Sequence, residues 1–254
     1  HQMKLDEKDN LYLTDTNNNR LKIHSQTNLS HIRSYGTLGR HATSYHVPTG
    51  LTYNNSFITI TNEGNFELVR LDVSTLGFKL NTDLDFNIAA EASLVEDEDK
   101  VYMAYNKISD EAVYFLDLIL ESRAKSDYSL INRVRIIPEF GLEFSTYSIV
   151  GNIALRGRYI YCVFSDRRST VGANYYIQKR LKKDFSLVKQ YRTNQIIRGI
   201  IGEPFPYKPT TRNEKRDLGV EGRYIQVKFY DEGLDNQVRL INQTYIIQQE
   251  TLKF

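Results

Sequence analysis

Basic and aromatic side chains gather in three polar stretches of the sequence. Tyrosine offers a ring on which a sugar can stack and a hydroxyl that forms hydrogen bonds, and arginine can hold a phosphate through two parallel hydrogen bonds. Such residues in loops predict a site for a glycan or phosphate ligand; the alternative is that they are solvated loop residues. The candidate ligand-binding residues are Arg40, His41, Tyr45, His46, Arg167, Arg168, Tyr207, Arg212 and Arg216.

Sequence patterns typical of catalysis or metal binding are absent. There is no Gly-x-Ser-x-Gly motif and no phosphate-binding P-loop. Cys162 lies in an apolar run, which predicts a buried and inert thiol. No histidine pairs with a cysteine or with another histidine at helical i, i+4 spacing. We therefore expect no catalytic residue, no metal site and no cofactor.

The charge balance and hydropathy of the chain argue against two broad classes of function. Its 254 residues include 33 Lys or Arg and 31 Asp or Glu, a formal net charge of +2. So small a charge argues against a nucleic-acid partner held by a broad basic surface. No apolar run reaches the roughly 18 residues of a membrane span, and one cysteine cannot form an internal disulfide. We expect neither nucleic-acid binding nor membrane insertion.

A repeat of strand-like segments predicts the fold. Five β-branched or aromatic runs begin at positions 11, 57, 101, 159 and 224, and each follows a cluster of turn residues. A partner run and a returning run follow each of them, and an apolar segment precedes each. This pattern predicts an all-β, five-bladed β-propeller with four antiparallel strands per blade, the alternative being a β-sandwich. The expected blades of this single domain (residues 1–254) span 3–48, 49–91, 92–147, 148–215 and 216–254.

The expected innermost strands bear on enzymatic function. They cover residues 3–5, 50–53, 92–95, 149–155 and 218–220, and none carries an acidic residue. A glycoside hydrolase needs carboxylates about 5–9.5 Å apart at the axis. The acidic residues lie only near the ends of the innermost strands and are Asp6, Asp85, Glu91, Glu96 and Glu221. This pattern argues against a glycan-processing enzyme.

Outside the innermost strands, the third strand of the third blade is expected at residues 112–116.

Long loops indicate which face binds a ligand. Links from one blade to the next and loops between second and third strands emerge on the same face, which we name the long-loop face. The expected links include 36–49, 138–148 and 193–217, and long loops on a rigid scaffold often carry binding residues. Closure of the ring would place the chain ends side by side, as suits a domain inserted in or excised from a longer chain.

One basic cluster is the best argument for RNA binding. It alternates with apolar residues along two expected strands, which more simply describes one exposed side of a sheet. RNA binding therefore ranks third among the binding functions. The cluster contains Lys179, Arg180, Lys182, Lys183, Lys189 and Arg192.

Residues 10–51 resemble an NHL repeat. The segment has a strand ending in Asp15, an Asn19-Arg20 pair after a short turn, a Gly-x-x-Gly loop at 36–39, and Pro48 at the start of the next blade. Asp15 can accept hydrogen bonds from the turn and pair with Arg20, and Asn17 to Asn19 tolerate left-handed backbone. The resemblance covers one blade of about 40 residues, implies a propeller and transfers no function.

Blade number and chain length are similar to those of the propeller domain in receptor-binding proteins of staphylococcal-type tailed phages. That resemblance implies binding of a glycosylated wall teichoic acid, a phage-tail virion or otherwise extracellular location, and a homotrimeric parent. We accordingly expect a noncatalytic recognition module for a cell-surface glycopolymer that mediates host adhesion. The alternatives are an NHL-type protein–protein interaction scaffold and a glycan-processing enzyme.

Overall fold

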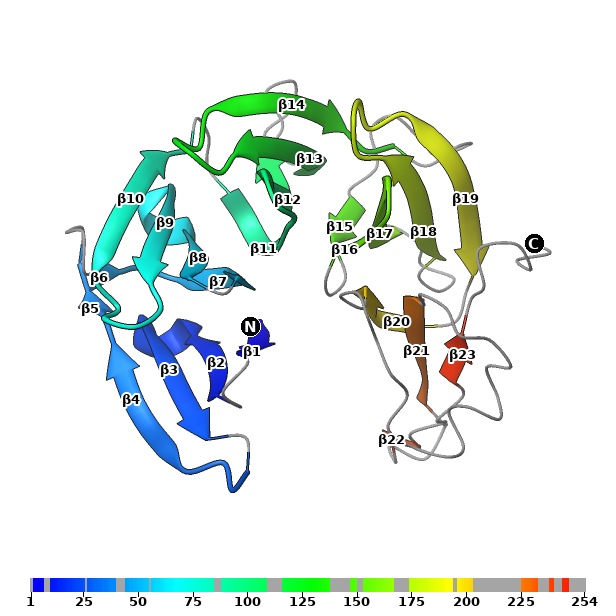
Figure 1. Cartoon of the computed structure of the whole chain (residues 1–254). Helices are drawn as coiled ribbons and strands as arrows, with labels where there is room; N and C mark the ends of the chain where they lie inside the picture. The colour runs from blue at the N-terminus through cyan, green and yellow to red at the C-terminus, as the bar shows by residue number, and fades with distance from the viewer. Residues whose placement is uncertain are drawn as a thin grey trace. The chain divides into compact units, whose positions relative to one another are not determined.

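The structure of the chain is a computed structural model (Figure 1). The structure describes residues 2–6, 10–25, 27–39, 44–54, 56–84, 88–108, 116–137, 147–149, 153–166, 174–193, 196–202, 225–232, 238–239 and 244–246. Contacts divide the chain into two compact units, residues 1–137 with 146–149 and residues 138–145 with 150–254. In the described part, no helix is long and apolar enough to cross a lipid bilayer.

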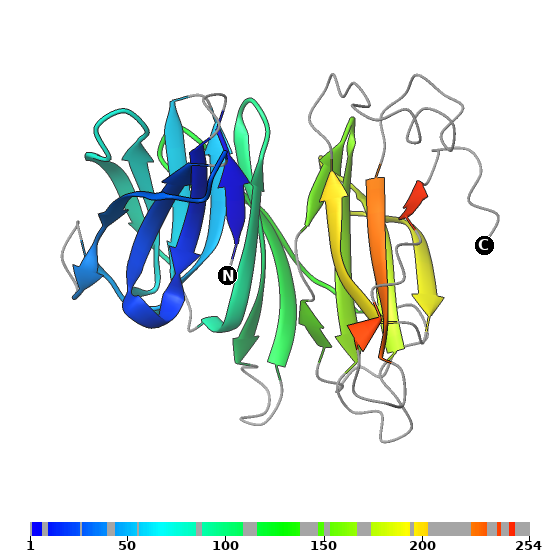
Figure 2. The same ribbon diagram turned by 90° about the horizontal axis from the view of Figure 1, so that it is seen from below.

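The first unit contains three antiparallel sheets of four strands, in which consecutive strands pair (Figures 1 and 2). Sheet one consists of β1 (Met3–Leu5), β2 (Asn10–Asp15), β3 (Arg20–Ser25) and β4 (His31–Tyr35). Sheet two consists of β7 (Pro48–Asn54), β8 (Phe57–Asn62), β9 (Glu67–Asp72) and β10 (Phe78–Asp83). Sheet three consists of β11 (Ile88–Glu96), β12 (Lys100–Ile108), β13 (Leu116–Ala124) and β14 (Leu130–Arg135).

The second unit contains sheets four and five. Sheet four pairs β16 (Ala154–Arg156), β17 (Tyr159–Asp166), β18 (Asn174–Leu181) and β19 (Leu187–Thr193) in that order. In sheet five, β21 (Ile225–Glu232) pairs with β20 (Ile196–Gly202), β22 (Val238–Arg239) and β23 (Thr244–Ile246). The first unit also contains β5 (Thr37–Leu38) and β6 (Ser44–Tyr45), which pair in parallel, and β15 (Tyr147–Ile149).

Turns with left-handed residues connect the strands. The 3-10 turns η1 (Thr16–Asn18) and η2 (Glu63–Asn65) join second to third strands, and the next residues, Asn19 and Phe66, have φ of 53° and 57°. Before each of the four outer strands β4, β10, β14 and β19, an apolar residue has positive φ: Leu29, Leu76, Tyr128 and Phe185. The last three are buried, so packing offsets the cost of about 1–2 kcal/mol for left-handed backbone.

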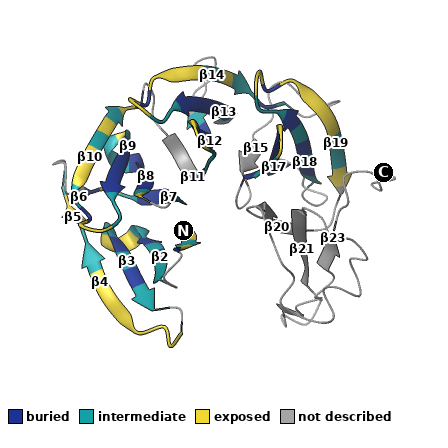
Figure 3. Cartoon of the chain, viewed as in Figure 1, coloured by how far each residue is buried: buried dark blue, intermediate teal, exposed yellow. Residues whose placement is uncertain are grey.

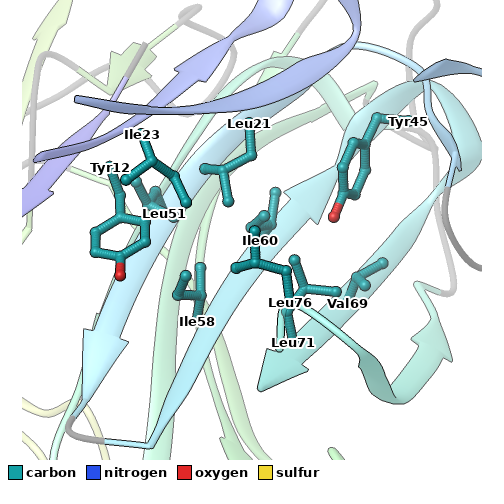
Figure 4. Packing of buried hydrophobic residues seen from close by; sticks show 10 residues of the cluster. All are labelled: Tyr12, Leu21, Ile23, Tyr45, Leu51, Ile58, Ile60, Val69, Leu71 and Leu76. Carbon is teal, nitrogen blue, oxygen red and sulfur yellow. The ribbon is translucent and has the colours of Figure 1, made fainter. Parts of the chain in front are cut away.

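The core of the first two sheets lies between their facing sides. Figure 4 shows ten of its residues, from strands β2, β3, β6, β7, β8 and β9 and the turn before β10. In sheets one to four, burial decreases from the middle strands to the last strand, and β4, β10, β14 and β19 carry most of the exposed strand residues (Figure 3). The chain is therefore all-β, with its apolar side chains packed on the faces of four-stranded sheets.

Three strand predictions differ from the structure. Strand β20 (Ile196–Gly202) pairs with β21, whereas the sequence placed these residues in a link and assigned the innermost strand of the fifth blade to 218–220, outside the described residues. The third strand of sheet three is Leu116–Ala124 rather than 112–116. Strand β11 reaches from Ile88 to Glu96, so that Glu91 and Glu96 belong to an innermost strand that was expected to carry no acid.

Candidate functional site

Two turns fix the link between sheets one and two on the long-loop face. The Asn19 side-chain oxygen accepts a hydrogen bond from the Val47 N–H at 3.0 Å, and that of Asn62 accepts one from the His46 N–H at 2.7 Å. The Gly64 N–H donates to the His46 carbonyl at 2.8 Å. The link is thus held in place by the backbone and the asparagines of η1, η2 and their flanking residues.

The structure describes two of the nine predicted ligand-binding residues. His46 is exposed, as a ligand contact requires. Tyr45 is fully buried in the core, its ring packed against Gly36 (φ 95°), and its hydroxyl has no hydrogen-bond partner among the described residues (Figure 4). Tyr45 therefore contributes packing at this position and offers no surface to a ligand. The other seven residues lie outside the described part: Arg40, His41, Arg167, Arg168, Tyr207, Arg212 and Arg216.

The expected pair of Asp15 and Arg20 is present and has a structural role. Arg20 Nε lies 2.8 Å from the Asp15 carboxylate, Lys22 Nζ lies 3.1 Å away, and the Asn18 amide donates at 2.8 Å. Burial opposes ionisation of Asp15, but these donors prevail and lower its pKa to about 2. All of these partners belong to the β2–β3 hairpin, so the group stabilises that hairpin.

Three buried carboxylates lie near the innermost strands of the first unit. Asp6 follows β1 and accepts hydrogen bonds from the Asn10 N–H and the Tyr12 hydroxyl, at 2.8 and 3.0 Å, within its own hairpin. The Glu63 carboxylate accepts hydrogen bonds from the Ala92 N–H at 2.7 Å and from the Thr49 hydroxyl. Glu96, at the far end of β11, lies 3.4 Å from Lys125 Nζ, and burial raises its pKa despite this lysine. Ala92 and Glu96 are four residues apart on one strand, a separation of about 13 Å. Glu63 and Glu96 thus do not converge as a catalytic pair would.

A group of cations lies at the end of sheet four opposite the long-loop face. We name Arg158, Lys179, Lys182 and Lys183 the basic end. The Arg158 guanidinium donates to the Tyr159 hydroxyl at 3.0 Å, and Lys179 Nζ lies 4.0 Å from the centroid of the same ring. Stacking on an aromatic face holds these long side chains in place at a modest gain in energy. The basic end is therefore partly ordered before any ligand binds.

The same position is not basic in the two preceding sheets. In sheets two, three and four, a backbone N–H of the turn before the last strand donates to a carbonyl of the turn between the first and second strands. The donor–acceptor pairs are Val73–Ser56, Lys125–Asp99 and Lys182–Arg158, each at 2.9 Å. These equivalent positions carry two neutral residues in sheet two, a lysine and an aspartate in sheet three, and two cations in sheet four. The positive charge belongs to sheet four alone among these three.

Sequence patterns only partly revealed this site. Lys179, Lys182 and Lys183 were recognised as basic but assigned to one exposed side of a sheet, together with Arg180. Arg180 is in fact buried and donates to the Gln178 side chain and the Phe185 carbonyl, at 2.8 and 2.7 Å. Arg158 was not connected with the lysines, since the pairing of two distant turns brings them together. In the described part, no three His, Cys, Asp or Glu side chains group as metal ligands.

Each of the first three sheets has four antiparallel strands in consecutive order. This is the construction of a blade in a β-propeller. Solved structures bear this out. The β-propeller domain of Cps50 (Swd1) from Myceliophthora thermophila has a TM-score of 0.52 at 10% identity, over 91% of this chain and 62% of that one. The Pan2 WD40 domain from Neurospora crassa has a TM-score of 0.56 at 10% identity, over 91% and 60%.

Hydrazine synthase from Kuenenia stuttgartiensis is also similar, with a TM-score of 0.56 at 8% identity, over 89% of this chain and 62% of that one. The chain spans about three fifths of the length of these structures. No protein-family model matches the sequence, and no curated protein sequence does. The chain therefore has a β-propeller fold, which both binding domains and enzymes adopt, and the count of five blades stays a prediction.

Proposed function

We propose that this β-propeller is a noncatalytic recognition module for a cell-surface glycopolymer that contains phosphodiesters, of the wall teichoic acid type. The observation that carries the proposal is the basic end of sheet four. Arg158 and Lys183 are exposed there, Lys179 and Lys182 are half-buried, and the neighbouring carboxylate of Asp184 lies 3.6 Å from Lys183 Nζ. Several cations on a small surface favour a ligand with repeated negative charges.

The chemistry of these side chains suits a phosphodiester. The Arg158 guanidinium can hold two phosphate oxygens at once, and each lysine adds a compact charge. The aromatic ring of Tyr159 is itself covered, so it orders the cations rather than stacking on a sugar. Contacts of exposed charges are screened by salt, so we expect binding to weaken as ionic strength rises.

The separation of Glu63 and Glu96 supports a function without catalysis. The Glu63 carboxylate accepts a hydrogen bond from the Ala92 N–H in the middle of β11, and Glu96 at the end of that strand forms an ion pair with Lys125. A glycan-processing enzyme would instead place two carboxylates on either side of a scissile bond.

We further propose that the parent protein is a tailed-phage receptor-binding protein located in the virion. A trimeric parent would present three copies of the site to one polymer, and linked sites gain avidity without any new contact. This part of the proposal rests on the resemblance in size and blade number.

A protein-interaction scaffold is the second candidate, and exposed apolar residues on the last strands favour it. Phe78 on β10 and Leu130 and Ile131 on β14 are 37%, 43% and 47% exposed. Leu187 and Val188 occupy the same position on β19. A protein partner could cover such residues, whereas a polyanion would gain little from them.

Two variants with equal net charge test the proposal against purified wall teichoic acid in pull-down and calorimetry. Arg158→Ala with Lys182→Ala and Lys183→Ala removes three of the four cations of the basic end. The matched control, Arg33→Ala with Lys79→Ala and Lys189→Ala, removes exposed cations from three last strands. We expect at least tenfold weaker binding for the first variant and less than twofold for the control. Equal loss in both would refute the basic end as the site.

Further measurements distinguish between the possible ligands and between binding and catalysis. Tighter binding of a homopolymeric RNA than of teichoic acid would overturn the glycopolymer, and release of free sugar would establish an enzyme. Lack of binding to both polymers would favour the scaffold. Arg212→Ala with Tyr207→Ala tests the predicted long-loop face, because loss of binding in this variant alone would move the site there.

A further inference from the structure

Two histidines face each other across the hairpin formed by β3 and β4. His24 on β3 is the register partner of His31 on β4, next to a bulge between Ile23 and His24. Their ring centroids are 5.4 Å apart, with the ring planes at 73°. His24 is half-buried and His31 is exposed, so both imidazoles can be reached from solvent. Facing side chains on paired strands have Cβ atoms about 4.5–5.5 Å apart, close enough to share one small ligand.

Each imidazole has one nitrogen engaged by its own hairpin. His24 Nδ1 lies 3.1 Å from the Leu29 carbonyl, which can only accept a hydrogen bond, so Nδ1 carries the proton and Nε2 keeps its lone pair. His31 Nε2 lies 2.9 Å from the Ser34 hydroxyl oxygen, which can accept a hydrogen bond from Nε2–H and thereby leave the lone pair on Nδ1. Partners of this kind fix the tautomer and orientation of metal-binding histidines.

We propose that His24 and His31 form a surface site for one divalent transition-metal ion. His24 Nε2 and His31 Nδ1 would be its protein ligands, and water would fill the remaining positions. Imidazole suits copper, nickel and zinc, and Cu²⁺ binds a given set of nitrogen ligands most tightly among these ions. The spacing of the two histidines in sequence did not indicate this site, because their proximity depends on the strand register.

The neighbouring charges are compatible with a weak site. Lys22, also on β3, is already paired with Asp15 at 3.1 Å, which offsets part of its charge. Arg33 is exposed on β4 and can turn away into solvent. With two protein ligands, such a site would be selective for Cu²⁺ over Zn²⁺ by the intrinsic order of affinities.

The experiment is a Cu²⁺ titration of the full chain in a buffer that does not bind metal. All proteins carry His1→Ala, His41→Ala and His46→Ala, so that the hairpin pair holds the remaining imidazoles of the five histidines. We expect one Cu²⁺ per chain, an electron paramagnetic resonance spectrum with two nitrogen donors, and weaker binding of Zn²⁺. Adding His24→Ala or His31→Ala should weaken Cu²⁺ binding at least tenfold.

Two outcomes would overturn the site: unchanged Cu²⁺ binding after either added substitution, or Zn²⁺ bound more tightly than Cu²⁺. Thermal unfolding without metal checks that the variants fold, which we expect because both side chains lie at the surface. Cu²⁺ should raise the melting temperature of the protein that retains the pair, since a ligand of the native state stabilises it by mass action. The melting temperature of the His24→Ala variant should not change when Cu²⁺ is added.

Discussion

The single carboxylate of Asp15 binds three other side chains of its hairpin. Its oxygens accept from Arg20, Lys22 and Asn18, and its side chain is 16% exposed. Burial opposes its ionisation, but the donors hold its pKa at about 2, below the ordinary aspartate value of 3.8. A pKa that is lower in the folded state means that the ionised carboxylate stabilises the fold. This stabilisation is present above about pH 4 and is lost as the pH falls through about 2.

The substitution Asp15→Asn tests this pH dependence. It should lower the free energy of unfolding by about 1 kcal/mol at pH 7, as for other partly exposed ion pairs. The difference from the parent chain should shrink between pH 4 and pH 2, because the parent then loses the same charge. Urea unfolding at several pH values measures this difference in the free energy of unfolding.

Glu98→Gln is the control, since Glu98 is exposed and forms no ion pair among the described residues. A loss of stability in Asp15→Asn that does not depend on pH would contradict the argument.

At the scale of the elements, sheets three and four carry different pairs of polar side chains at equivalent positions of their third and fourth strands. Glu121 on β13 faces Arg133 on β14, and in sheet four Gln178 faces Gln190. Glu121 is fully buried and binds both Arg123 and Arg133, at 2.7 and 2.9 Å. The neutral equivalent has Gln178 donating to Gln190 at 2.7 Å. The buried charged residues at these positions, Glu121, Arg123 and Arg180, each have hydrogen-bond partners.

This equivalence predicts the outcome of a double-mutant cycle. Glu121→Gln alone should cost about 3 kcal/mol, because it leaves two arginines beside a neutral side chain. Glu121→Gln with Arg133→Gln reproduces the composition of sheet four and should cost at least 1 kcal/mol less than the sum of the two single changes. Chemical denaturation of the four proteins gives the coupling energy. Additive effects would mean that the two sheets are not interchangeable at this position.

Sequence patterns predicted the strands whose side chains alternate or are uniformly apolar, such as β2, β8 and β17. They missed β13, because it carries Asp117, Glu121 and Arg123, charges that become acceptable only when neighbouring residues pair with them. The apolar run at 112–116 had the stronger β-propensity, but single-strand propensity does not include such partners.

The candidate sites depended even more on pairing between distant segments. The basic end combines a turn at 158 with a turn at 182, and the histidine pair depends on a register that includes a bulge. Tyr45 was expected at the surface because it lies in a long link between two blades. The structure buries it, since Gly36 leaves room for the ring. Residue type therefore indicated the chemistry, while the partners were set by the sheet topology.

At the scale of the first unit, a side chain near its first strand joins three sheets. Gln2 is buried, and its side-chain oxygen accepts hydrogen bonds from the Leu51 and Leu94 N–H groups, at 2.7 and 3.3 Å. Its amide nitrogen donates to the Ser93 hydroxyl at 2.9 Å. The strands β7 and β11 therefore share one acceptor, supplied from beside β1. In Figure 1 these first strands lie on the inner side of their sheets, where β7 contacts both β1 and β11.

Gln2→Ala should therefore loosen all three sheets of the unit. Two buried N–H groups lose their acceptor, which predicts a loss of about 2–4 kcal/mol in the free energy of unfolding and faster hydrogen exchange at Leu51 and Leu94. Ser93→Ala is the matched control, because it removes the partner of the Gln2 amide nitrogen and leaves both bonds to the oxygen. Exchange rates measured by NMR distinguish the two. If Gln2→Ala left both amides as protected as in Ser93→Ala, the Gln2 side-chain oxygen would not be what joins β7 and β11.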